Sequence, residues 1–152
     1  MGRRSRTAAA AAAASALACA AVALAATPEP GKYRGRTSQD RFVRVKVGDA
    51  GRIPRDGFKI HWSAGCQVRQ DMEWESATHN TERIRVEDGR FELSGEYTHR
   101  VGDYTGHVRV FIKGRFDTST SAHGKFRPSV RVTRDGDYVD TCKQPLSWRV
   151  SG

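Results

Sequence analysis

The stretch HVRVFIKGRFDTSTSAHGKFRPSVRV, His107 to Val132, decides the fold class because apolar and polar residues alternate along it. Strand side chains point to opposite faces at every second residue, so the pattern predicts two antiparallel strands joined through 117–121. Pro128 cannot donate a backbone hydrogen bond, so its strand is expected to be an edge or to be interrupted there. The residues expected to face the core are Val108, Val110, Ile112, Gly114, Phe116, Ala122, Gly124, Phe126, Pro128, Val130 and Val132.

The outward positions of the same stretch are mostly cationic, with histidines at 107 and 123. Such a face can gather phosphates or carboxylates with a salt-dependent affinity. It can equally be a solvated sheet face whose charges protect an edge against aggregation. The candidate binding residues are Arg109, Lys113, Arg115, Lys125, Arg127 and Arg131.

The same alternation continues through most of the chain, without a 3.6-residue apolar stripe. It predicts inward residues at 43, 45 and 47, and again from Phe58 to Trp74, including Val68, with a break or bulge near Gly65. Asp-Gly at 88–89 and 135–136 predicts tight hairpin turns. Together these patterns predict a single-domain antiparallel β-sandwich or barrel of about eight to ten strands.

The first 26 residues have the layout of a secretory signal peptide. Three arginines precede an uncharged, alanine-rich run that ends in small residues. An uncleaved anchor is the alternative, because residues 8–26 approach the length of a membrane span. We therefore expect a signal peptide at 1–26, a proline-containing linker at 27–32, and an exported domain at 33–152 that is secreted or extracytoplasmic.

Composition agrees with one basic domain. The 152 residues contain 26 Lys and Arg against 17 Asp and Glu, a net charge of +9 that becomes +6 without the three leader arginines. Removing the leader also leaves two cysteines, Cys66 and Cys142. In an oxidising compartment such a pair is expected to form one disulfide.

Motifs of catalysis or cofactor binding are missing from the sequence. It contains no GxSxG, P-loop or dinucleotide fingerprint, and its five histidines lack metal-ligand spacing. Glu73 and Glu75 flank Trp74, which is more simply an outward acidic stripe than a glycosidase pair. The aspartates at 135, 137 and 140 lack the remaining positions of a calcium loop. We expect no enzymatic activity, no cofactor and no metal site.

Three motifs resemble a family of small secreted bacterial all-β domains of unassigned function. They are YRGRTSQ at 33–39, the Gly-x-Phe hairpin FIKGRFDTSTSAHGKFR at 111–127, and Cys142 before Trp148. The resemblance implies an exported all-β domain and no particular activity.

Taken together, the sequence predicts a non-catalytic binding or envelope-associated module. Its expected partner is an anionic envelope polymer, contacted through the basic hairpin, or another extracytoplasmic protein; nucleic acid is less favoured because no exposed aromatic cluster accompanies the charge. The alternatives are a small extracytoplasmic hydrolase with an unrecognised site, and an inert structural or protein-interaction domain. The sequence leaves the oligomeric state open.

Overall fold

The computed structural model describes residues 25–152, so the predicted leader falls almost entirely outside the described part. Those residues form nine strands and no helix, which confirms the all-β prediction, and none of them offers a helix able to span a membrane. The strands are β1 (Gly31–Thr37), β2 (Phe42–Val47), β3 (Phe58–Gly65), β4 (Glu73–His79), β5 (Arg90–Val101), β6 (Tyr104–Thr118), β7 (Ser121–Arg134), β8 (Asp137–Lys143) and β9 (Leu146–Ser151).

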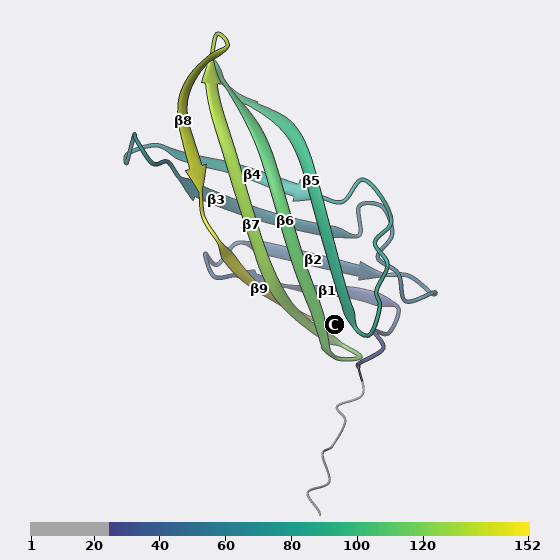
Figure 1. Cartoon of the computed structure of the whole chain (residues 1–152). Coiled ribbons are helices and arrows are strands. Elements are labelled where there is room, and N and C mark those ends of the chain that lie inside the picture. The colour runs from purple at the N-terminus through teal and green to yellow at the C-terminus, as the bar shows by residue number, and fades with distance from the viewer. Residues whose placement is uncertain (1–24) are drawn as a thin grey trace, which may run out of the picture.

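All strands belong to one nearly closed antiparallel sheet. Its order is β4-β3-β2-β1-β9-β7-β6-β5, and β8 pairs with the far half of β7. Figure 1 shows the sheet folded over on itself, with β1 to β4 crossing behind β5 to β8. The end strands β4 and β5 are not paired with each other in this order, so the sheet has an open seam between them.

The hairpin predicted around residues 107–132 is confirmed as β6 and β7, which pair from Tyr104↔Arg134 to Thr118↔Ser121. On one side β7 pairs with β6 throughout, and on the other side its partner changes from β9 to β8 near Pro128. The last pair with β9 is Phe126↔Leu146, and the first pair with β8 is Ser129↔Lys143. The strand carrying the proline is therefore interrupted on that side. The missing N–H falls where β7 has no ladder partner to accept from it.

The core between the two layers is built from aromatic side chains contributed by strands from both layers. Phe58 on β3 contacts Trp148 on β9 and Phe91 on β5, with ring centroids 5.5 and 6.3 Å apart. Phe91 and Trp148 lie over backbone positions that have no side chain, Gly114 and Gly124, which are their direct cross-strand partners. The three tryptophans are buried, as expected from their parity.

The predicted Asp-Gly turns form, with positive φ at both residues of each: 49° and 68° at 88–89, and 52° and 88° at 135–136. The first turn does not join two full strands, however. Upstream of it there are only isolated bridges, Ile53↔Ile84 and Glu87↔Arg90. Residues 84–86 are apolar at alternate positions, but the β5 strand that follows takes β6 as its partner instead.

The disulfide between Cys66 and Cys142 is confirmed. The predicted break near Gly65 is also confirmed, because β3 ends there. The prediction that Val68 faces the core is wrong: its side chain is 70% exposed. It lies in the loop between β3 and β4, where the backbone turns around the Asp140 carboxylate and strand alternation no longer applies.

Residues just before β1 pack against the end of the β6–β7 hairpin. Pro28 is buried, and the backbone N–H of Glu29 donates to the carbonyl of Ser119 at 2.9 Å. The Tyr33 hydroxyl donates toward the carbonyls of Glu29 and Ser119. Burial, helped by the Glu29 charge, raises the pKa of Tyr33.

Candidate functional site

The six predicted binding residues all point outward, but two of them face a carboxylate and the other four do not. Arg109 contacts Glu96 of β5 at 2.9 Å, and Lys113 contacts Glu92 at 3.1 Å, so both β6 cations face a carboxylate on the neighbouring strand. Within residues 25–152, the other four predicted cations make no ion pair: Arg115, Lys125, Arg127 and Arg131. The unneutralised charge therefore shifts from β6 toward β7.

From β7 the positive charge continues onto the other layer. Four strands adjacent in the sheet, β2, β1, β9 and β7, contain ten Lys and Arg and no Asp or Glu. Carboxylates appear on the strands at the seam, β4 and β5. We call the outward cations of the four acid-free strands the basic wall: Lys32, Arg34, Arg36, Arg44, Lys46, Lys125, Arg127, Arg131, Arg134 and Arg149.

Several cations of the basic wall stand directly opposite one another across the strands. Arg34 pairs in register with Arg44, Lys32 with Lys46, and Arg36 with Arg149. Like charges directly opposite each other destabilise a sheet. Nearby, partial burial and the charges of Lys59 and Arg41 lower the pKa of His61. Two cations of the basic wall have a carboxylate partner, Arg36 with Asp40 at 3.7 Å and Arg134 with Asp103 at 3.6 Å. Within residues 25–152 the other eight make no ion pair, so most of this surface is repulsive.

His123 lies where this surface is hollowed. It stands in register between Arg115 of β6 and Arg149 of β9, and its Nδ1 is 2.7 Å from an Asp117 carboxylate oxygen. Three shallow hollows of the outer face adjoin at His123. One hollow is lined by Arg34, Arg36 and Arg149 together with the small residues Ser121 and Ser151, so an anionic group can approach several cations there. Two of the hollows also contain a carboxylate, Asp117 or Glu92.

Removing one member of an opposed pair should stabilise the protein. We expect Arg149→Thr to raise the free energy of unfolding by about 0.5 kcal/mol at low ionic strength, because Arg36 loses a like-charged neighbour directly opposite it. Added salt should shrink the gain, since exposed charges are screened. Arg109→Thr is the matched control, because it leaves Glu96 without its cationic partner and should lower stability slightly. Urea unfolding at two salt concentrations measures both, and a salt-independent loss in Arg149→Thr contradicts the repulsion.

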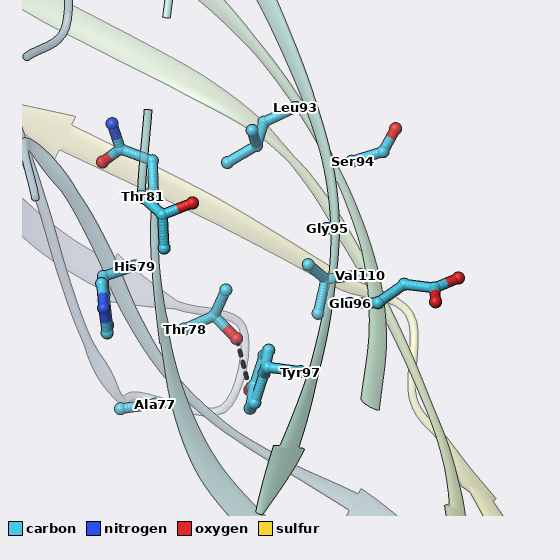
Figure 2. Close-up of a pocket in the computed structure, with 11 residues that line it drawn as sticks. Ala77, Thr78, His79, Thr81, Leu93, Ser94, Gly95, Glu96, Tyr97 and Val110 are labelled. Atoms are coloured by element: carbon cyan, nitrogen blue, oxygen red, sulfur yellow. Dashed lines mark hydrogen bonds between the residues drawn. The ribbon is translucent and has the colours of Figure 1, made fainter. Parts of the chain in front are cut away.

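A second candidate site lies at the seam. It is a pocket of about 180 Å³ between β4 and β5, which we call the seam pocket. Figure 2 shows Leu93, Val110 and Tyr97 on one side, Thr78 and Ala77 on the other, and Glu96 pointing away. Leu93 and Tyr97 have inward parity on β5 but are only half-buried, because they line the seam where no backbone ladder joins β5 to β4.

A chain of hydroxyl groups closes one wall of the seam pocket. The Trp62 indole N–H donates to Thr78 Oγ1 at 2.9 Å, and the Tyr97 hydroxyl lies 2.8 Å from Thr78 Oγ1 and 3.1 Å from Ser76 Oγ. Asn80 is held by the Phe58 N–H at 2.7 Å and is buried. These contacts join the end of β4 to β5 through side chains where the backbone ladder is missing.

Asp140 is a structural residue that sequence reasoning did not identify. Its side chain is fully buried and accepts hydrogen bonds from the backbone N–H groups of residues 67, 68, 69 and 141, at 2.6 to 3.2 Å. Burial acts to raise the pKa of Asp140, but the four N–H donors outweigh it and bring the pKa below its ordinary value. The signal was present: Asp140 shares the inward parity of Cys142, and a buried carboxylate requires donors.

The catalytic alternatives gain little from this arrangement. A histidine held by a carboxylate through Nδ1, as His123 is by Asp117, can act as a general base. Within residues 25–152, however, no hydroxyl or thiol hydrogen-bonds to that imidazole. Glu73 and Glu75 are exposed on β4, and Glu75 contacts Arg41 at 2.5 Å. They form an outward stripe and not a cleft.

Three comparisons with known proteins give no match: no protein-family model, curated protein or solved structure is significantly similar to this chain. The fold and the two surfaces are therefore interpreted on their own geometry, and the family resemblance of the three motifs stays a prediction.

Proposed function

We propose that this protein is a non-catalytic binding module that holds an anionic polymer against the basic wall, outside the cytoplasm. The disulfide is compatible with an extracytoplasmic location. The contact surface differs from the hairpin face alone, because the β6 cations Arg109 and Lys113 are already paired with Glu96 and Glu92. It runs instead from β7 across β9 to β1 and β2.

The observation that carries the proposal is the set of opposed cations Lys32/Lys46 and Arg34/Arg44, with Arg36/Arg149 beside them, where Arg36 also lies 3.7 Å from Asp40. Each such pair costs stability, and a bound polyanion removes that cost by placing negative charge between the two cations. A face whose only role is solubility needs charge, but not charge of one sign in adjacent strands. Mixed signs serve that role without the repulsion.

The spacing of the cations suits a chain of repeated anionic groups. Neighbouring strands lie roughly 5 Å apart, and outward residues along one strand repeat at roughly 7 Å. Phosphate, sulfate or uronate groups along one polymer can therefore each meet a cation of the wall, with His123 and the hollows around it in the middle. Each added contact releases counterions, which makes binding strongly dependent on salt.

The test compares two triple variants of equal net charge on a heparin column. The wall variant is Arg34→Gln/Lys125→Gln/Arg149→Gln, and the control is Arg41→Gln/Arg85→Gln/Arg109→Gln, whose cations face Glu75, Glu87 and Glu96. We expect the wall variant to elute at clearly lower salt than the control. Its plot of log affinity against log salt should be shallower by roughly 2 to 3, if each lost contact counts as one phosphate does for DNA.

Equal weakening in both variants contradicts the proposal, because it shows that heparin responds only to net charge. Unchanged retention of the wall variant contradicts it as well. Far-ultraviolet circular dichroism of both variants checks that they keep the β-fold, and we expect the wall variant to be at least as stable as the native protein, since it loses opposed cations.

A further inference from the structure

We propose that the seam pocket binds a neutral ligand, or a neutral part of a larger one, of about the size of one aromatic ring and with one hydroxyl group. The pocket holds about 180 Å³. An apolar cavity of about 150 Å³ engineered in another protein is large enough to bind benzene. The seam pocket is thus too small for a drug-sized molecule and well matched to a single ring.

The pocket is open because Gly95, an inward position of β5 that faces it, has no side chain. Gly95 lies on the inward side of β5 between Leu93 and Tyr97, where alternation calls for a large apolar residue. A Cβ at Gly95 meets only the Val110 side chain, at an ordinary contact distance of 3.6 Å. The backbone there does not require glycine. The empty space therefore results from the missing side chain and not from a constraint on the backbone.

The lining favours a neutral guest. Leu93 and Val110 offer apolar surface, and the polar groups at the rim are engaged elsewhere: the His79 ring with Asp56 at 3.6 Å, and Glu96 with Arg109 at 2.9 Å. Glu96 also points away from the pocket in Figure 2. An ion entering the pocket loses its hydration without gaining a partner, whereas an apolar ring gains contacts on both sides.

The hydroxyl requirement comes from Tyr97. A phenolic oxygen offers one donor and acceptor positions, and two of these are used by Thr78 and Ser76, at 2.8 and 3.1 Å. One hydrogen-bonding position is left on the wall of the pocket. A hydroxyl group on the ligand can serve it in either direction, because a hydroxyl both donates and accepts.

The experiment titrates phenol, at millimolar concentration, into the full domain and follows methyl resonances of Thr78, Leu93 and Val110 by NMR. We expect saturable shifts at these methyls, and binding at least tenfold weaker in Gly95→Val, whose side chain fills the space. Gly65→Val is the matched control, because its Cβ has no neighbour within 4 Å and it lies at the exposed end of β3. Tyr97→Phe should weaken phenol more than toluene.

Gly95→Val is expected to stay folded, because its Cβ meets Val110 at an ordinary contact distance, the rest of the side chain enters open space, and β-branched residues suit a strand. Equal phenol shifts in the native protein and in Gly95→Val overturn the proposal, as do shifts confined to residues outside the pocket or none at all. Equal losses of phenol and toluene in Tyr97→Phe overturn the hydroxyl requirement. None of these outcomes depends on the basic wall, so this site stands or fails independently of polyanion binding.

Discussion

Replacing both bridged cysteines, Cys66→Ala/Cys142→Ala, is expected to lower the free energy of unfolding by about 4 kcal/mol. The bridge joins residues 76 apart in sequence, and cross-linking a loop of that length restricts the unfolded chain by about this amount in the loop-entropy model. A domain of this size has roughly 5 to 15 kcal/mol in total. The variant should therefore unfold at a much lower urea concentration than the native protein.

Two controls separate the effect of the covalent bond from the effect of replacing the cysteine side chains. Each single variant, Cys66→Ala and Cys142→Ala, should lose nearly as much as the double variant, because either one abolishes the bridge. Native protein unfolded in a reducing agent should approach the same midpoint. If the double variant and the native protein unfold at the same urea concentration, the bridge contributes nothing and the loop-entropy argument fails for this chain.

Without the disulfide, the loop after β3 should still be attached to β8. The Asp140 carboxylate still holds the backbone N–H groups of residues 67, 68 and 69 at 2.7 to 3.2 Å. The loop after β3 is thus attached to β8 twice, once covalently and once through a buried anion. This second attachment explains why so short a loop, without regular strand structure, stays against the sheet.

The fold class was predictable because it follows from patterns among residues that are close in the sequence. Alternation at 107–132 is a property of neighbouring residues, and it predicts the β6–β7 hairpin with its inward face. The Asp-Gly turns are local in the same way, since positive φ at two adjacent residues needs residue types that tolerate it.

The candidate site was predictable only in part, because its charges are combined by pairing of distant strands. Arg36 and Arg149 lie 113 positions apart in sequence numbering and become opposed neighbours only through the β1–β9 ladder. Conversely, Arg109 and Lys113 appeared free in the sequence and are neutralised because the β5–β6 register places Glu96 and Glu92 opposite them. No local pattern shows which cation meets which charge.

The seam pocket was beyond sequence reasoning for a different reason. Leu93 and Tyr97 lie on one face of β5 by alternation, but alternation cannot say whether another layer covers that face. Cover depends on where β4 ends relative to β5, since these strands finish the sheet without pairing. Gly95 carries the one available hint, as glycine inside a strand often marks close backbone approach or missing packing.

The second large effect on stability is expected where β1 pairs with β9, a place that we call the β1–β9 joint. Gly35 of β1 lies between Val43 of β2 and Val150 of β9, and a Cβ built on it comes within 1.8 Å of the Arg149 carbonyl oxygen. The obstacle is backbone, which cannot rotate away as a side chain can. We expect Gly35→Ala to lower the free energy of unfolding by about 3 kcal/mol, at the upper end of overpacking costs.

Gly65→Ala is the matched control for the same chemical change. It also lies on a strand with ordinary φ, and no atom is within 4 Å of its added Cβ, so its stability should stay within about 0.5 kcal/mol of the native value. Urea unfolding compares the two, and equal midpoints contradict the crowding at the joint. Because β1 and β9 supply opposed arginines of the basic wall, Gly35→Ala should also weaken heparin retention. A loss of stability with unchanged retention means that the spacing across this joint does not matter for the polyanion.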